Sequence, residues 1–292
     1  MPARSRFSII IPCFNSAPVI DAAIESVRRQ DWPAEIIVVD GGSSDGTQER
    51  VRAHGDLVAT CISEPDRGIY DAINKGLSRC TGDLIGILGS DDRYVPGAFA
   101  RIWQASTVHK ADLYAGATRM VSPDGSTTLR TDEPYGLNAL VSGIPFGHNA
   151  MFATPAAYTR VGPYDLKYRI CADSHWVHRA VRLGLACHTI ADVVVEFALT
   201  GTSSRNDEEI MAETFETIAE NFPGLGRDEA KTLLYAARGW GPSEPVASIL
   251  EARPGDALLR QAVEAAMPDL VRGRGGSSNK GLLRRLLTSM LR

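Results

Sequence analysis

Residues 84–92 read L-I-G-I-L-G-S-D-D, an apolar run that breaks at glycine and ends in two adjacent carboxylates. Such a run is typical of a buried strand, which would carry Asp91 and Asp92 to the rim of a sheet. Paired carboxylates at a rim suit a hard divalent cation, and that cation suits a substrate diphosphate. Two Asp residues at a strand end are equally suited to a turn or to the cap of a following helix. The stretch alone leaves both interpretations open.

The first part of the chain shows strand, helix and strand patterns in succession. Residues 8–15 (S-I-I-I-P-C-F-N) form one apolar run, and residues 36–47 (I-I-V-V-D-G-G-S-S-D-G-T) form a second that ends in an acid and a flexible loop. Apolar residues between the two recur at helical spacing. A strand–helix–strand unit predicts a right-handed crossover and a parallel sheet. Asp40 and the 91–92 pair would then lie at the carboxyl ends of strands, where open α/β sheets bind ligands.

Five blocks of sequence together resemble the inverting glycosyltransferases of family 2. This resemblance implies a GT-A fold, the nucleotide-diphospho-sugar transferase fold, in which a mostly parallel central sheet is flanked by helices; a helical C-terminal extension follows. The resemblance covers roughly residues 6–200. The blocks, in the family's order, are I-I-I-P-C-F-N (9–15), V-V-D-G-G-S-S-D-G-T (38–47), S-E-P-D-R-G-I-Y-D-A-I-N-K-G (63–76), L-G-S-D-D (88–92) and F-G-H-N-A-M-F (146–152) with G-P-Y-D-L-K-Y-R-I-C-A-D-S-H-W (162–176).

The expected domain organisation follows from these blocks and from changes in composition. We expect a GT-A domain over residues 1–204, with a nucleotide-binding half at about 6–100 and an acceptor half at about 101–204. The later segments are predicted to be a helical extension (205–271), a flexible basic linker (272–281) and an amphipathic basic helix (282–292).

Composition is consistent with a cytoplasmic enzyme. The chain has 292 residues, of which 44% are hydrophobic, so it can bury a sizeable core. Its formal net charge of −4 argues against a general nucleic-acid binder. Five cysteines without a C-x-x-C spacing indicate reduced thiols rather than a disulfide framework. The sequence has neither an apolar run long enough to span a membrane nor an apolar N-terminal signal segment.

The chemistry of a sugar nucleotide suggests a role for the paired acids. Cleavage of its glycosidic bond develops negative charge on a diphosphate, which a bound Mg²⁺ or Mn²⁺ neutralises. We take Asp92 as the first choice for the protein's metal ligand and expect Asp91 to face the ribose or to share the metal. The family often has a third acid two residues before this pair, where this chain has Gly89.

The resemblance implies further contacts to the nucleotide sugar. Asp40 ends the second strand beside the expected base, but Gly41 replaces the second acid that the family carries there. Phe14 suits ordinary core packing nearly as well as a ligand contact, and Asp66 also suits a helix N-cap. The expected nucleotide-sugar contacts are Pro12, Phe14, Asp40, Asp66, Arg67, Lys75, Asp91 and His148.

An inverting transfer also needs a general base to deprotonate the acceptor hydroxyl. Asp173 in C-A-D-S-H-W matches the family's acid at the start of the acceptor-side helix, and we assign it that role. A carboxylate at a helix N-terminus is also favoured by the helix dipole alone. The sequence contains neither G-x-x-x-x-G-K-[ST] nor G-x-G-x-x-G, and it lacks zinc-site spacing.

The last residues are basic and amphipathic in pattern. Residues 272–292 contain six basic residues and no acid, and 282–292 place leucines on one helical stripe. This pattern predicts binding to an anionic membrane surface at the inner face of the cytoplasmic membrane. Docking on the chain's own surface, or on a second subunit of a homo-oligomer, is the alternative.

Together these observations predict a metal-dependent inverting glycosyltransferase. It would move a sugar from a UDP- or GDP-sugar to a saccharide or lipid-linked saccharide in polysaccharide or glycolipid assembly. A sugar-1-phosphate nucleotidyltransferase is one alternative, although it would need a glycine-rich basic loop after the first strand, where this chain has C-F-N-S-A-P. A non-catalytic, membrane-tethered scaffold that binds nucleotide sugars is the other.

Overall fold

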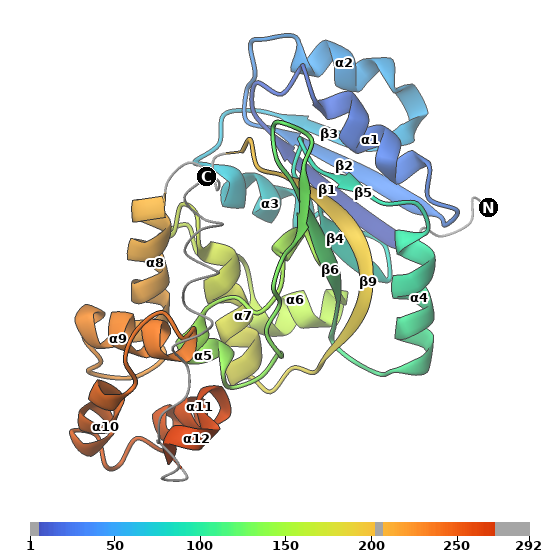
Figure 1. Cartoon of the computed structure of the whole chain (residues 1–292). Coiled ribbons are helices and arrows are strands. Elements are labelled where there is room, and N and C mark those ends of the chain that lie inside the picture. The colour runs from blue at the N-terminus through green and yellow to red at the C-terminus, as the bar shows by residue number, and fades with distance from the viewer. Residues whose placement is uncertain (1–5, 202–206, 272–292) are drawn as a thin grey trace. The chain divides into compact units, whose positions relative to one another are not determined.

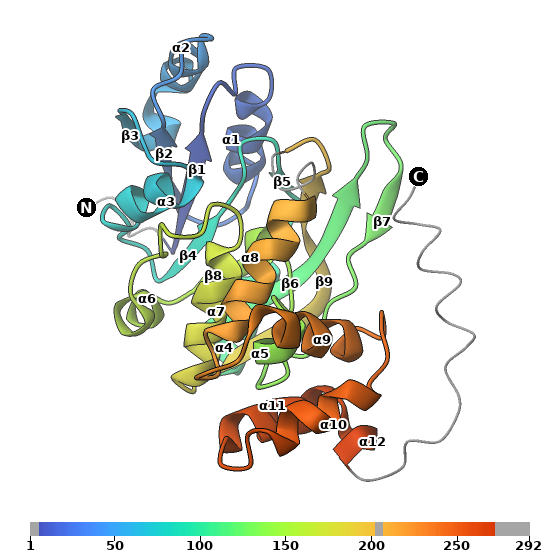
Figure 2. The same cartoon turned by 90° about the vertical axis from the view of Figure 1, so that its left-hand side faces the viewer.

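The computed structural model describes residues 6–201 and 207–271 (Figures 1 and 2). Contacts divide the chain into two compact units. The first holds the described residues up to Glu133 together with Phe146–Ile210. The second holds Pro134–Pro145 and the described residues from Met211 onward. The segments predicted as a basic linker and an amphipathic helix, 272–281 and 282–292, lie outside the described residues.

The first unit is built on a mixed sheet of nine strands in the order β3-β2-β1-β4-β8-β6-β9-β5, with β7 paired to β6. The pairs β1–β2, β2–β3, β1–β4 and β6–β9 are parallel, and β8 lies antiparallel between β4 and β6. The prediction of a mostly parallel sheet is confirmed. The strands are β1 (Phe7–Cys13), β2 (Ala34–Asp40), β3 (Val58–Ser63), β4 (Leu84–Ile87), β5 (Arg93–Tyr94), β6 (Leu113–Val121), β7 (Thr127–Leu129), β8 (Met151–Ala153) and β9 (Cys187–Ala198).

The strand β1 lies between two parallel neighbours and all seven of its residues are buried. A strand covered on both faces needs a continuous apolar run, which F-S-I-I-I-P-C supplies. Its Phe7 ring stacks on Phe99 with ring centroids 4.4 Å apart and contacts Phe152 edge-on at 5.7 Å. The core of the first unit is thus centred on β1.

Helices connect and cover the strands of this sheet (Figure 1). They are α1 (Ile20–Arg28), α2 (Thr47–Ala53), α3 (Ile69–Leu77), α4 (Ala98–Val108), α6 (Pro155–Val161) and α7 (Ala172–Arg182), with single turns at η1 (Gly55–Leu57) and η2 (His148–Ala150). The helix α3 approaches β1 closely because it has Gly76 at the contact: a Cβ there would lie 2.7 Å from Ile10 Cγ2. A larger residue would force the helix away from the strand.

The second unit is helical among its described residues. It contains α5 (Ala139–Ser142), most of α8 (Asp207–Ala219), α9 (Arg227–Ala237), α10 (Glu244–Glu251), α11 (Ala257–Ala266) and α12 (Pro268–Val271). Leu233 on α9 and Leu259 and Val263 on α11 are fully buried, so these helices share an apolar core. Among the described residues of either unit, no helix is long and apolar enough to cross a membrane.

Candidate functional site

The carboxyl ends of the parallel strands bring most of the predicted site residues to one edge of the sheet. The register pairs Cys13 with Asp40, and β4 ends beside β1 at Ile87. Because β8 runs antiparallel to β4, the turn η2 that precedes β8 lies at this same edge. The edge therefore carries the acids that follow β2 and β4, together with His148 and Asn149 of η2.

Asp92 is buried at this edge and both of its oxygens accept hydrogen bonds. The residue is only 1% exposed. Oδ1 accepts from the backbone N–H of Ala198 at 2.9 Å, and Oδ2 accepts from Asn149 Nδ2. Burial, followed by the charge of Asp91, raises the pKa of Asp92 to about 7. Asp92 thus joins the end of β4 to the end of β9 and to η2.

Asp91 is the more accessible member of the pair. It is half-buried, and its Oδ2 accepts from Thr200 Oγ1 at 3.2 Å. The position two residues before the pair has no room for the family's third acid, because a Cβ at Gly89 would collide with Asp92 Oδ2. Accessibility therefore favours Asp91 over the predicted Asp92 as the residue that offers oxygen to a ligand.

Asp40, the last residue of β2, is fully buried. It is 0% exposed. Its carboxylate accepts from the backbone and hydroxyl of Ser43 and from Ser63 Oγ at 2.6 Å. These hydrogen bonds satisfy its oxygens in the interior, since a buried polar group needs hydrogen bonds. Asp40 thereby shapes the loop after β2 and ties it to the end of β3, and its contact with a base stays a prediction.

A second acid, Asp66, occupies the space beside the end of β2. A Cβ built on Gly41 would lie 2.5 Å from Asp66 Oδ2. Its Oδ1 accepts from the backbone N–H of Gly68 at 2.9 Å, in the manner of a helix or turn cap. The carboxylate of Asp66, from the β3–α3 loop, thus lies in the space into which a side chain at position 41 would extend.

The basic residues near this loop are paired with protein groups. Lys75 Nζ lies 3.0 Å from Glu64 Oε1 and donates to the carbonyl of Pro65 at 3.0 Å. Arg67 is largely exposed and pairs with Asp71 at 3.0 Å. Lys75 therefore supports the β3–α3 loop, and the prediction that it faces a diphosphate is not met in this conformation.

The loop after β1 is held against its neighbours through polar contacts. Ser16 Oγ lies 2.9 Å from Ser90 Oγ, and the backbone N–H of Asn15 donates to Ser43 Oγ at 2.7 Å. Pro12 is buried within β1, whereas Phe14 is 63% exposed. The alternative of Phe14 as a core residue is thus wrong, because its side chain is exposed at this edge.

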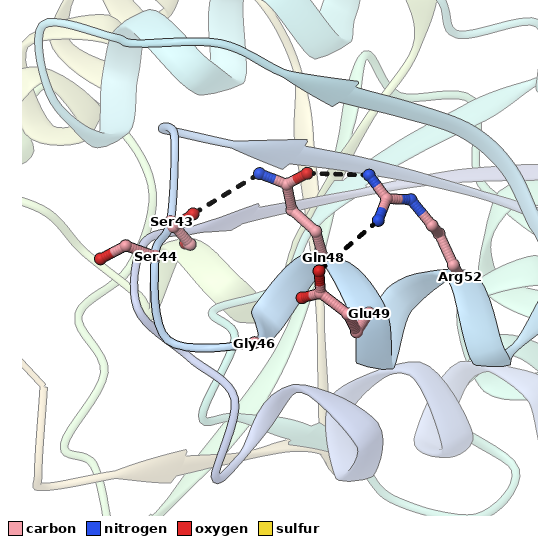
Figure 3. Close-up of a pocket in the computed structure, with 6 residues that line it drawn as sticks. All are labelled: Ser43, Ser44, Gly46, Gln48, Glu49 and Arg52. Carbon is pink, nitrogen blue, oxygen red and sulfur yellow. Dashed lines mark hydrogen bonds and ion pairs between the residues drawn. The ribbon is translucent and has the colours of Figure 1, made fainter.

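A hollow of about 360 Å³ opens on the loop between β2 and α2 (Figure 3). Its lining is polar, and Arg52 within it donates to Gln48 at 2.9 Å. None of the acids at the sheet edge lines it, so we separate it from the candidate active site. The lining residues are Ser43, Ser44, Gly46, Gln48, Glu49 and Arg52.

Asp173 lies in the first turn of α7, as expected, and is half-buried. Its Oδ1 accepts from Tyr70 Oη at 3.1 Å and from the backbone N–H of Ser174 at 2.8 Å. His148 Nε2 lies 2.8 Å from Tyr164 Oη nearby, and burial lowers the pKa of His148, so its ring is neutral at pH 7. The sequence patterns give no indication that Tyr70, Tyr164, Asn149 or Thr200 would lie beside these groups.

Comparison with known proteins places this geometry in context. The family model described as glycosyl transferase family 2 matches residues 8–165. The chain is 33% identical over 177 residues to a "PGL/p-HBAD biosynthesis glycosyltransferase" of Mycobacterium tuberculosis, which covers 59% of this chain and 68% of that protein.

Two solved structures share the fold. S. aureus TarS 1–349 in complex with UDP has a TM-score of 0.61 at 18% identity, covering 92% of this chain and 82% of that one. The mannosyltransferase PcManGT from Pyrobaculum calidifontis, in complex with GDP-Man and Mn²⁺, has a TM-score of 0.59 at 19% identity, covering 94% and 89%.

The buried charge of Asp92 leads to a prediction about stability. The folded-state pKa of about 7 exceeds the ordinary value of 3.8. The folded chain therefore holds one more proton between these values, and its stability falls as pH rises from about 4 to 7. Asp92→Asn carries no charge, and Asn149 can turn its amide oxygen toward the new amide. In the presence of a chelator, we compare the free energy of unfolding of Asp92→Asn with that of wild type. We expect this difference to favour the variant by on the order of 2 kcal/mol more at pH 8 than at pH 5.

Thermal and urea unfolding of both proteins at the two pH values checks this expectation. An equal stability difference at pH 5 and pH 8 would show that Asp92 does not carry an unfavourable buried charge.

Proposed function

The chain belongs to glycosyltransferase family 2, and we propose that it is a metal-dependent, inverting enzyme that uses a UDP-sugar donor. The observation that carries this proposal is the convergence, at one sheet edge, of the accessible Asp91 carboxylate with Asp66, which stands beside the end of β2. Asp91 suits a cation that is bound to the diphosphate, and Asp66 suits the nucleotide base. Asp173, held through one oxygen only, supplies the remaining chemical group.

Asp91 is the residue that we propose for binding Mg²⁺ or Mn²⁺. Both oxygens of Asp92 already accept protein hydrogen bonds. Asp91 keeps accessible oxygen, with Thr200 beside it. The described residues hold no cluster of three or more acidic, His or Cys side chains for a metal. This fits ions that take few protein ligands and complete their shell with phosphate and water. When bound, the ion would neutralise charge on the leaving diphosphate.

Calorimetric titration of UDP and GDP, with and without Mn²⁺, tests whether Asp91 or Asp92 binds the metal. We expect Mn²⁺ to strengthen nucleotide binding to wild type by at least about tenfold and to have no such effect on Asp91→Asn. Asp92→Asn should keep the Mn²⁺ effect. The reverse pattern, with the effect lost only in Asp92→Asn, would restore Asp92 as the ligand.

Asp66 is proposed to recognise the nucleotide base. Its Oδ1 is occupied by Gly68, while Oδ2 has no hydrogen-bond partner among the described residues and lies against Gly41. A single accepting oxygen matches the one ring N–H of uracil better than the adjacent donors of guanine. Phe14, exposed on the neighbouring loop, offers an aromatic face to the same base. The TarS and PcManGT complexes contain UDP and GDP-Man respectively, so both bases occur on this fold.

Asp66→Asn should change the preferred base. The amide oxygen is needed for the N–H of Gly68, which turns the NH₂ group toward the ligand. That group repels the uracil N–H and suits the accepting ring nitrogen of cytosine. We expect the preference for UDP over CDP, measured as a ratio of Kd values, to fall about tenfold or more.

Asp124→Asn is the matched control for this substitution. Asp124 accepts from the backbone N–H of Ser126 at 2.9 Å, so it makes the same two-residue turn contact on an exposed turn. An unchanged UDP-to-CDP ratio in Asp66→Asn would rule out base recognition by Asp66.

Asp173 is proposed as the general base. The acceptor hydroxyl would attack the anomeric carbon and form the new glycosidic bond. Its proton would pass to Asp173, and the bond to the diphosphate would break with its electron pair leaving on the phosphate oxygen. Inversion follows because attack and departure occur on opposite faces of the sugar.

Asp173→Asn should separate chemistry from binding. General-base catalysis contributes about 10²–10⁴-fold, so nucleotide release from UDP-GlcNAc or GDP-mannose, with water as acceptor, should fall by that amount. The Kd for UDP should stay within about threefold of wild type, because the carboxylate acts on the acceptor side.

The neighbouring Asp165→Asn is the control, since Asp165 only accepts from the backbone N–H of Lys167 at 3.0 Å within its own turn. Undiminished turnover in Asp173→Asn would remove Asp173 from the mechanism.

The acceptor that we propose is a saccharide or a lipid-linked saccharide of glycolipid or polysaccharide assembly. The support is the mycobacterial relative, whose name places it in PGL/p-HBAD biosynthesis. Contact with an anionic membrane at the inner face of the cytoplasmic membrane remains a proposal from the basic sequence pattern of residues 272–292, as does self-association.

A further inference from the structure

We propose that Tyr70 is a positioning residue for the general base: its hydroxyl holds Oδ1 of Asp173, so that Oδ2 is the oxygen that takes the acceptor's proton. The inference rests on the proposed role of Asp173. It joins the helix that follows the nucleotide-side loop, α3, to the helix that carries the base, α7.

The position of the Tyr70 ring is determined by the helix that carries it. Tyr70 is the second residue of α3 and is 6% exposed. Gly76, which has no side chain, allows the other end of α3 to pack closely against Ile10 of β1. Asn74, in the middle, donates to the carbonyl of Tyr164 and accepts from its N–H, both at 2.9 Å. A helix held at both points leaves its tyrosine little freedom to move.

The hydroxyl of Tyr70 lies between two acceptors. One is Asp173 Oδ1 at 3.1 Å, and the other is the carbonyl oxygen of Ile170. A phenol has one proton and donates to one acceptor at a time. An ionised carboxylate attracts that proton more strongly than a carbonyl does. Once Asp173 has taken a proton, the hydroxyl can donate to Ile170 instead. The bond to Asp173 is thus strongest in the state in which Asp173 acts as a base.

The two oxygens of Asp173 have different surroundings. Oδ1 accepts from Tyr70 and from the backbone N–H of Ser174 at 2.8 Å. Oδ2 has no hydrogen-bond partner in residues 6–201 and 207–271. A carboxylate fixed through one oxygen presents the other in a constant direction, which is what a general base within hydrogen-bond reach of its substrate requires.

Burial keeps Tyr70, Tyr164 and His148, which lie near Asp173, in their neutral forms. Burial, followed by the charge of Asp173, raises the pKa of Tyr70 well above its usual value, so Tyr70 stays a protonated donor. Burial also raises the pKa of Tyr164, whose ring stacks on Tyr70 with centroids 5.6 Å apart. Burial lowers the pKa of His148 despite the charge of Asp173. Cys171, just before α7, is buried.

Tyr70→Phe tests the inference by removing only the hydroxyl. We expect the acidic limb of the pH profile for nucleotide release from UDP-GlcNAc or GDP-mannose to move up by about one pH unit, because a carboxylate that loses a donor takes up a proton more readily. The KM for the donor and the Kd for UDP should not change. ¹³C-carboxyl NMR, with the Asp173 signal identified by its loss in Asp173→Asn, should show the same upward movement of the titration midpoint without requiring turnover.

Tyr158→Phe is the matched control. Tyr158 is also a buried phenol of this cluster, but its hydroxyl contacts Tyr164 Oη at 3.2 Å and not Asp173. Its pH profile and the Asp173 signal should match those of wild type. Should Tyr70→Phe fold poorly, 3-fluorotyrosine at position 70 keeps the ring and strengthens the donor, so the limb and the midpoint should move to lower pH.

The outcomes separate this inference from the proposed function. An Asp173 midpoint and acidic limb that stay at wild-type pH in Tyr70→Phe, or in the fluorotyrosine protein, overturn the role of Tyr70 and leave the base assignment intact. Full turnover in Asp173→Asn overturns the base assignment itself. A Tyr70→Phe protein that loses UDP binding along with turnover shows a merely structural role and also overturns the inference.

Discussion

The parallel pairing of β1 with β2 on one side and β4 on the other is the constraint on which the first unit depends. Parallel neighbours require crossover helices, and these cover the sheet and bury β1 completely. The same pairing makes β1 and β2 end together at Cys13 and Asp40, while β4 ends at Ile87, beside Ile10 of β1. Polar residues that follow each strand are thereby gathered in one place, although they are far apart in the chain.

Two acids at this edge have a structural role because they are buried and accept hydrogen bonds from the protein. Asp40 and Asp92 are both essentially inaccessible. Asp40 accepts from Ser43 and Ser63, whereas Asp92 also has the charge of Asp91 beside it, and its pKa rises to about 7. Both hold loops in place. Asp66 and Asp91, at the same edge, are only half-buried.

The sequence predicted the parallel sheet, the edge that carries the site and the acids that gather there, because strand patterns and strand ends are local features. It did not predict which acid would be buried, because the deciding partners are remote: Asn149 is 57 residues and Ala198 is 106 residues from Asp92. The partners of Asp40 and Lys75 were not foreseen for the same reason, since Ser63 and the Glu64–Pro65 loop fold back onto them. Tyr70 meets Asp173 across 103 residues, a pairing that no spacing within one motif reveals.

The presence of glycine instead of an acid at position 41, directly after β2, affects how the nucleotide preference of such a site can change. A carboxylate at position 41 would follow directly on Asp40, the last residue of β2, so the register of the sheet would fix its position. A carboxylate from the β3–α3 loop occupies the same space but belongs to a segment that tolerates substitution and insertion. Descendants of such a chain could acquire a new nucleotide preference by altering a short surface connection while the scaffold beneath it remained unchanged.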